Sequence, residues 1–376
     1  MTRPWRSKVG RPLPLRAIWL LAAIPLAAPV VFSGALRAAD LFQLSTDETN
    51  ALFDKAKAAV VQVHCNDGGI INAGTGFFID DQGTVLTSSS LLGDGTSPRV
   101  VINGVEMDAK IVGNDPHSGL AMLHVDYNAS PSLPLAHTSG LQTGDGVMVI
   151  GFPLNLPVAP SQGPVNGFDA SYLTRLDGKT EKVDGKEVAA VERFATTHIH
   201  ANVAISPGEI GAPVLNATGT VVGIVATSPD DGRSVYALPV EAMQKVMADF
   251  AQFGHARQGW VGVNVIPAGD AAHDGRSVRV VDVVPGSPAS ATGIQAGDTL
   301  MRIDSREIYR PADVLDASFF SQVGASMSVV VRRDDKLYSY NFPVVERPAV
   351  LPASTGTIVT GAKATAPIAT DSATHP

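Results

Sequence analysis

The chain has 376 residues, of which 45% are hydrophobic and 17% charged, with 36 glycines and 26 prolines. This length provides for two or three domains that each bury a core, and the many glycines and prolines indicate turns and short strands rather than long helices. The formal net charge is −8, which argues against a nucleic acid or an anionic membrane surface as the partner.

The first 38 residues have the three parts of a secretory signal. Basic residues stand at the start, an apolar run extends from Ala17 to Phe32, and small residues follow. An uncleaved membrane anchor is the alternative, although the run is short for a span and Pro25 and Pro29 interrupt it. We therefore expect an exported protein of the periplasm or cell envelope, anchored only if the signal stays uncleaved. Removing the six basic residues of this segment from the 28 leaves 22 against 36 acidic ones, a net charge of −14.

After this leader the pattern changes from one helix to many strands. Ser45 and Glu48 have the spacing of a capping box, and Leu52 and Phe53 follow at helical spacing. Short β-rich runs with glycine turns come next, then a polar stretch over 169–193 that is typical of an exposed hairpin or loop. The expected strands are 60–64, 74–79, 84–87, 99–102, 108–112, 121–125, 146–150, 194–205, 221–227 and 234–238. A helix that begins near Pro239 closes this region, and the short strands indicate a sandwich or a barrel.

Five motifs stand in a fixed order within this strand region. They start at Gly74, Gly83, Asp115, Gly144 and Ser206, and the last reads Ser-Pro-Gly-Glu-Ile-Gly-Ala-Pro-Val. Together they resemble the HtrA/Deg family of trypsin-like serine proteases over residues 60–250. The resemblance implies a mostly β, two-barrel trypsin-like domain, the chymotrypsin fold.

The resemblance also implies which positions correspond to the catalytic triad of the family. Ser90 stands at the position of the general-base histidine, Gly119 at that of the aspartate, and Ile210 at that of the nucleophilic serine. Acyl transfer needs a nucleophile, a base for its proton and a group that orients the base. Isoleucine, serine and glycine do not supply these groups at those positions. We therefore expect a degenerate triad, no catalytic residues, and a pseudoprotease that is not an enzyme.

Relocated catalytic groups are the alternative. His198 and His200 alternate along an expected strand and so face one side, where they could also hold a metal. A third metal ligand is not identified, and we expect no metal and no cofactor. The displaced nucleophiles to consider are Ser206, Ser88 and Ser89, with His117, His198 or His200 as the base.

The region after a short linker at 254–258 is a second β-rich unit. Gly259-Trp-Val-Gly-Val and Pro285-Gly-Ser-Pro-Ala resemble the carboxylate-binding loop and the following signature of a PDZ domain, as found behind HtrA protease domains. The resemblance implies a groove that adds a peptide as a strand and captures its terminal carboxylate with backbone N–H groups. The expected peptide-binding residues are Trp260, Val261, Gly262, Val263, Leu315 and Phe319.

These observations divide the chain into a signal (1–38), a trypsin-like domain (39–253), a PDZ domain (259–345) and a disordered tail (346–376). We expect an exported, non-catalytic protein that binds polypeptide segments or protein C-termini, as a scaffold, chaperone or regulator of an active HtrA relative. The alternatives are an active endopeptidase with relocated groups and a purely structural envelope subunit. The resemblance makes a homo-oligomer, a trimer, an expectation as well.

Overall fold

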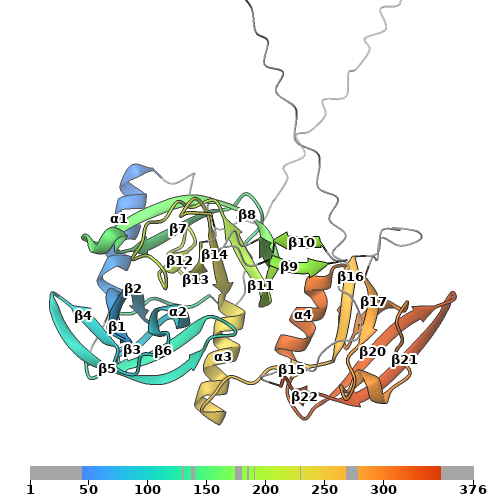
Figure 1. The fold of residues 1–376 in the computed structure, drawn as a ribbon. Coiled ribbons are helices and arrows are strands. Elements are labelled where there is room, and N and C mark those ends of the chain that lie inside the picture. The colour runs from blue at the N-terminus through green and yellow to red at the C-terminus, as the bar shows by residue number, and fades with distance from the viewer. Residues whose placement is uncertain are drawn as a thin grey trace, which may run out of the picture. The chain divides into compact units, whose positions relative to one another are not determined.

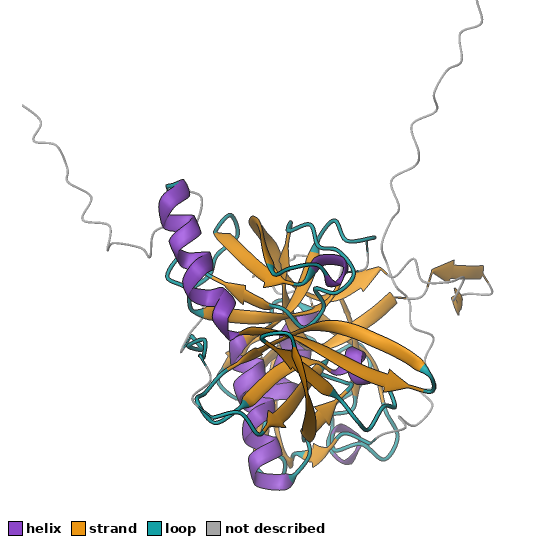
Figure 2. Cartoon of the chain, turned by 90° about the vertical axis from the view of Figure 1, so that its left-hand side faces the viewer, coloured by secondary structure: helices purple, strands orange, loops and turns teal. Residues whose placement is uncertain are grey.

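The computed structural model describes residues 45–128, 131–136, 140–173, 180–183, 186–189, 191–228, 230–267 and 278–348 (Figure 1). The expected signal at 1–38 and nearly all of the expected tail at 346–376 lie outside these residues. Strands make up most of the described body (Figure 2). No helix among the described residues is long and apolar enough to cross a membrane.

The first six strands close into a barrel, as their spacing predicts. Their order around the barrel is β1-β2-β3-β6-β5-β4. Alternate residues such as Val63, Phe78, Val85 and Leu123 point inward and are buried, each contributing about 2 kcal/mol by leaving water. The strands are β1 (Val60–Asp67), β2 (Ile70–Phe78), β3 (Thr84–Ser88), β4 (Arg99–Ile102), β5 (Val105–Asp115) and β6 (Leu120–Val125).

Six further strands close into a second barrel in the order β11-β14-β13-β12-β7-β8. Its interior is lined by small and β-branched residues, among them Val149, Val214 and Val225. The two barrels confirm the trypsin-like fold class. The strands are β7 (Gly146–Gly151), β8 (Ala159–Leu173), β11 (Val191–Ala201), β12 (Pro213–Leu215), β13 (Val221–Thr227) and β14 (Val235–Pro239).

Strand β8 differs from the sequence expectation, which placed no strand there. Pro160 and Pro164 lack the N–H that a ladder needs, and Gly163 adds a further turn signal. The structure pairs Pro160 with Ile150 and Pro164 with Gly146 along β7. Gly163 is required because a Cβ there would lie 2.0 Å from the Asn202 carbonyl oxygen. The prolines are therefore accommodated in a strand paired with β7, and the glycine leaves room for the backbone of Asn202.

Helices pack against the barrels. Helix α1 (Thr46–Ala56) has the expected capping box, in which the Ser45 hydroxyl accepts from the Glu48 N–H and the Glu48 carboxylate accepts from the Ser45 N–H. The short α2 (Ser89–Leu92) follows β3 directly, and α3 (Val240–Phe253) follows β14 with Pro239 as its N-cap. Residues from both barrels and α3, among them Phe77, Met148 and Phe250, form one shared core.

The polar stretch before β11 contains a hairpin, as expected. Strands β9 (Thr180–Val183) and β10 (Lys186–Ala189) pair antiparallel as a separate two-stranded sheet.

The second β-rich unit is a sheet flanked by helix α4 (Pro311–Phe320), with the strand order β16-β17-β18-β20-β21 and β19 paired to β18. Its apolar residues form a core of their own, which includes Val280, Leu300 and Val329. Strand β16 is at one edge of the sheet, and α4 contacts it (Figure 1). The strands are β16 (Val263–Pro267), β17 (Val278–Val283), β18 (Thr299–Ile303), β19 (Arg306–Glu307), β20 (Ser326–Arg333) and β21 (Lys336–Pro343). A separate pair, β15 (Gly259–Trp260) and β22 (Val345–Glu346), joins the two ends of this unit.

Candidate functional site

A cavity of about 770 Å³ opens between residues of the two barrels. The first barrel supplies the end of β3 with α2 and the turn between β5 and β6. The second supplies β11, the end of β13 and the loop before β12. The lining residues are Ser88, Ser89, Ser90, Gly93, Asp94, Pro116, His117, Ser118, Gly119, Phe194, His198, Ile210, Ala226, Thr227 and Ser228. We call this cavity the cleft.

Ser90, Gly119 and Ile210 all line the cleft, although 120 positions separate the first from the last in the sequence. Ser90 is exposed on α2, and its Oγ lies 2.9 Å from the Oγ of Ser88. Gly119 has φ of +82°, and its carbonyl accepts from the Ser89 N–H at 2.9 Å. Ile210 is half-buried and packs against the core of the second barrel. Their correspondence to the triad positions of the family stays a prediction.

The loop that carries Ile210 is fixed by hydrogen bonds to the first barrel. Thr75 of β2 donates its hydroxyl to the Gly208 carbonyl at 2.7 Å and its N–H to the Ile210 carbonyl at 2.9 Å. Gly211 has φ of +84°, and a Cβ there would lie 2.2 Å from the Thr75 carbonyl oxygen. Within the described residues, neither the Gly208 N–H nor the Ile210 N–H donates a hydrogen bond. The loop thus leaves two backbone donors that can bind an oxygen atom of a ligand.

Glu209 stands between these two donors and is 2% exposed. One carboxyl oxygen accepts from the Ser206 N–H at 2.6 Å, and the other has no partner among the described residues. Burial raises the pKa of the Glu209 carboxyl, and the bond from Ser206 offsets part of that rise. The sequence alone gave this residue no role.

Two imidazoles line the cleft. Partial desolvation lowers the pKa of His117, although the side chain is exposed at the rim of the cleft; the charge of Arg347 lowers it further, and that of Asp115 opposes the shift. His198 is buried, and burial lowers its pKa to about 4, against the raising effect of its bond to the Thr196 carbonyl. Both rings are therefore biased toward the neutral form, which can accept a proton or a hydrogen bond.

His198 and His200 lie on one side of β11, as their spacing predicts, within a series of rings. His198 stacks on Phe194 with centroids 3.8 Å apart, and His200 stacks on Tyr236 at 4.5 Å. His200 Nε2 lies 3.2 Å from the Oγ of Ser234, whose hydroxyl donates to Asp230 at 2.8 Å. In the part of the chain that the structure describes, no group of three or more metal-ligating side chains occurs.

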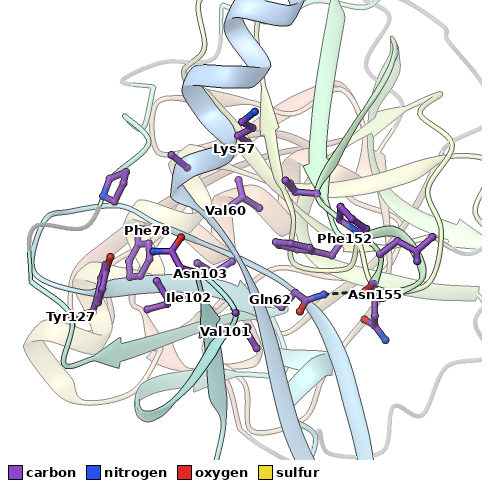
Figure 3. Close-up of a pocket in the computed structure, with 17 residues that line it drawn as sticks. Lys57, Val60, Gln62, Phe78, Val101, Ile102, Asn103, Tyr127, Phe152 and Asn155 are labelled. Carbon is purple, nitrogen blue, oxygen red and sulfur yellow. Dashed lines mark hydrogen bonds between the residues drawn. The ribbon is translucent and has the colours of Figure 1, made fainter.

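A second cavity, of about 670 Å³, lies beside the first barrel (Figure 3). Its walls are mostly apolar, with Phe78, Tyr127 and Phe152 among them, and Gln62 donates to the Asn155 carbonyl at 3.4 Å across it. Its lining contains no serine, cysteine, histidine or carboxylate. Among the described residues, Lys57 and Tyr127 are its only ionisable lining groups, and no carboxylate or imidazole lines it to act as a base.

The expected peptide groove has a turn with two available donors. Gly262 has φ of +82°, and its carbonyl accepts from the Val284 N–H at 2.8 Å and from the Ser287 hydroxyl at 3.2 Å. Within the described residues, the N–H groups of Val261 and Gly262 make no hydrogen bond. The Val261 side chain is 2% exposed, so this residue offers only its backbone to a ligand.

The other expected groove residues differ in their exposure. Trp260 and Val263 are half-buried at the start of the unit, and Leu315 is half-buried on α4. Phe319 is 1% exposed, and Lys245 Nζ lies 4.9 Å from the centre of its ring. Its ring is enclosed by the shared core, so we remove Phe319 from the expected ligand contacts.

Comparison with known families identifies both regions. The family described as "Trypsin-like peptidase domain" matches residues 74–224, and the family described as "PDZ domain" matches residues 259–344. The solved structure described as "HtrA-type protease AlgW with tripeptide" aligns with a TM-score of 0.65 at 23% identity, covering 80% of this chain and 98% of that one. A serine endoprotease from Yersinia pestis aligns with a TM-score of 0.59 at 22% identity, covering 81% and 100%.

Curated relatives match most of the chain. "Serine endoprotease DegS" of Salmonella typhimurium is 26% identical over 81% of this chain and 89% of its own length. A protein of Bartonella henselae named "Probable periplasmic serine endoprotease DegP-like" is 29% identical over 62% of this chain. The chain spans less than two thirds of several such relatives, between 45% and 64% of their length.

These comparisons correct one expectation. We expected from Ser90, Gly119 and Ile210 that the chain is not an enzyme. The relatives that it matches over up to 81% of its length are named serine endoproteases. The resemblance to a trypsin-like domain followed by a PDZ domain is confirmed.

Proposed function

The chain combines a trypsin-like peptidase domain with a PDZ domain and is homologous to the HtrA, DegS and DegP proteases, and from this premise we propose that it is an HtrA-type endopeptidase that selects polypeptide segments through its PDZ groove. Several relatives are named periplasmic, which supports the same compartment for this protein.

The observation that carries the proposal is the edge of the PDZ sheet. Strand β16 has a sheet neighbour only on the β17 side among the described residues, and α4 flanks it. The free N–H groups of Val261 and Gly262 stand at its start. An extended peptide can add to this edge while its terminal carboxylate meets the two donors. The solved HtrA-type protease AlgW is described with a tripeptide and with a decapeptide, which supports a peptide ligand.

The cleft is the proposed place of peptide-bond hydrolysis. Residue 210 is isoleucine, so the hydroxyl has to come from another residue of the cleft, and Ser90 is the exposed one on α2. His117 is a cleft imidazole whose lowered pKa keeps it able to accept a proton near neutral pH. The unengaged N–H groups of Gly208 and Ile210 can stabilise the oxyanion.

Peptide binding tests the PDZ part of the proposal. Fluorescent decapeptides with a free C-terminus should bind at least ten times more tightly than the same peptides with an amidated C-terminus, because amidation removes the charge that the loop captures. Leu315→Asp should weaken binding, while Leu337→Asp, which is 66% exposed on β21, should not. Equal binding of both peptide forms would exclude carboxylate capture.

A cleavage assay tests the peptidase part. Full-length protein is incubated with β-casein, and the products are identified by mass spectrometry. We expect Ser90→Ala and His117→Ala each to lower cleavage at least tenfold, because general acid–base catalysis contributes that much or more. Ser206→Ala should leave cleavage unchanged, because Ser206 does not line the cleft. Absence of cleavage would refute the peptidase part and leave the peptide-binding result standing.

The expected homotrimer and the expected association with an active HtrA relative stay predictions. A homotrimer is tested by sedimentation equilibrium of the purified chain, where the expected mass is three times 39.1 kDa less the signal. Association with an active HtrA relative is tested by co-sedimentation of the two proteins, where separate boundaries would exclude it.

A further inference from the structure

His198 is held in one tautomer. Its Nδ1 lies 2.9 Å from the Thr196 carbonyl oxygen. A carbonyl oxygen can only accept, so Nδ1 carries the proton and donates. Nε2 therefore carries a lone pair, and the neutral ring presents an acceptor at that atom.

This acceptor is not satisfied. Nε2 has no hydrogen-bond partner among the described residues. It is also shielded from water, since His198 as a whole is 1% exposed. A buried polar atom without a partner costs about 1–3 kcal/mol, so native structures rarely keep one without a reason. Its neighbour on the strand, His200, has Nε2 beside the Ser234 hydroxyl at 3.2 Å. The missing partner is thus particular to the histidine that lines the cleft.

His198 lines the cleft, but its Nε2 is covered in this structure, so a donor reaches the atom from the cleft only when the side chains over it move aside. Phe194 is nearly parallel to the imidazole, with 17° between the planes, so it covers a face of the ring. The Nε2 lone pair lies in the plane of the ring and points past that face. Ala226, Thr227 and Ser228 line the same cavity from the end of β13.

We propose that His198 Nε2 accepts a hydrogen bond from a ligand side chain in the cleft, and that the cleft selects polypeptide segments with an uncharged O–H or N–H donor at that position. This inference rests on the proposed function, because the ligand is a polypeptide. Threonine, serine, asparagine and glutamine offer such a donor. A carboxylate would place a second lone pair against Nε2 and is selected against, and an alkyl side chain would leave Nε2 unpaired.

The test uses threonine and valine, which have the same shape and differ by one hydroxyl. Decapeptides of otherwise identical sequence carry Thr or Val at one position in turn and compete with fluorescent β-casein for the full chain. Their C-termini are amidated so that the PDZ groove contributes little. At one position the Thr peptide should bind about two to ten times more tightly than the Val peptide, the range for one net hydrogen bond.

Two variants assign the preference to His198. His198→Phe keeps a ring to stack on Phe194 but has no acceptor, and it should lose the Thr preference. His198→Gln offers an amide oxygen and should restore part of the preference, which also covers the case that the Phe variant fails to fold. His200→Phe is the matched control on the same strand and should keep the full preference.

The outcomes separate the two proposals. If the wild-type chain binds β-casein but prefers Thr over Val at no position, or if His198→Phe keeps the preference, the inference about His198 is wrong and the proposed function stands. If the wild-type chain does not bind β-casein at all, the proposed function fails, and the inference fails with it.

Discussion

At the scale of single residues, two side chains of the cleft differ most from what an enzyme site is expected to hold. Ile210 presents an alkyl group on a loop whose backbone donors remain available. His198 presents a buried acceptor that no described residue satisfies. The first could be read from the sequence. The second could not, because the partner of a histidine ring depends on which atoms the fold brings beside it.

The lowered pKa of His198 predicts a dependence of stability on pH. Its pKa is about 4 in the folded protein and about 6.5 in the unfolded chain, so the unfolded chain binds the proton more readily between these values. The stability that depends on a neutral His198 is complete above pH 6.5 and is lost as the pH falls toward 4. The loss should approach about 3 kcal/mol.

Urea unfolding at pH 7.5 and pH 4.5 measures this effect. His198→Phe should remove most of the difference between the two pH values, and His200→Phe should keep it. Glu209, with its raised pKa, acts in the opposite sense but is present in every variant, so it cancels in the comparison. A wild-type pH dependence that His198→Phe leaves unchanged would show that other groups are responsible.

Two glycines of the PDZ unit distinguish the cost of a left-handed backbone from the cost of a steric clash. Gly262 and Gly286 have similar φ values, +82° and +75°, but a Cβ at Gly262 would lie 2.0 Å from the Ser287 Cβ, while Gly286 has nothing within 4 Å. Gly286→Ala should cost about 1–2 kcal/mol for the left-handed backbone alone. Gly262→Ala should cost clearly more, because Ser287 has to move. Thermal unfolding of both variants measures the difference, and equal losses would contradict this account.

At the scale of elements, helix α4 is joined to strand β11 by one carboxylate. Asp316 accepts from the Thr196 hydroxyl at 2.6 Å, the Thr197 N–H at 2.7 Å and the Thr197 hydroxyl at 2.9 Å. Its side chain is mostly buried, and Arg306 lies 3.7 Å away. A carboxylate with several donors contributes more than a neutral pair, because each bond is assisted by its charge.

Removing this carboxylate should therefore be costly. Asp316→Ala leaves the buried Thr196 hydroxyl without its acceptor and should lower the free energy of unfolding by about 2–3 kcal/mol. Urea unfolding followed by circular dichroism measures the change. Asp126→Ala, at an exposed position after β6 without a left-handed backbone, is the control and should change stability little. A loss for Asp316→Ala no larger than that of the control would show that the helix is held by its apolar contacts alone.

At the scale of the whole molecule, the sequence predicted the two kinds of domain and most strands of the barrels. Alternating apolar residues and glycine turns are local signals, so β1, β4 and β13 could be located from a few residues each. Strand β8 was missed because Pro160, Gly163 and Pro164 locally favour a turn. Pairing with β7 and the close approach of the Asn202 backbone make them part of a strand instead. Phe319 was assigned to the groove from its position on α4, but its ring is buried in the core shared with the barrels and α3, which no local pattern shows.

The contacts between domains predict how the chain responds to truncation. A chain that ends at residue 254 lacks both Asp316 and Phe319, which meet β11 and α3 in the full chain. We expect its trypsin-like domain to unfold at lower urea concentration than the same domain in the full chain, and Asp316→Ala to reproduce part of that shift. Equal midpoints for the truncated and full chains would contradict this expectation.

Thr196 uses its two polar groups for two different neighbours, its hydroxyl for Asp316 and its carbonyl for His198. Replacements at this position are therefore limited by the need for the hydroxyl, because any residue supplies the backbone carbonyl. Serine is the one replacement that retains a small hydroxyl, and valine, although it matches the volume, leaves a carboxylate oxygen short of a donor. In a saturation library selected for solubility, codon 196 should tolerate serine and few other residues, whereas codon 200, whose half-buried ring stacks on Tyr236 and lies beside the Ser234 hydroxyl, should tolerate more replacements.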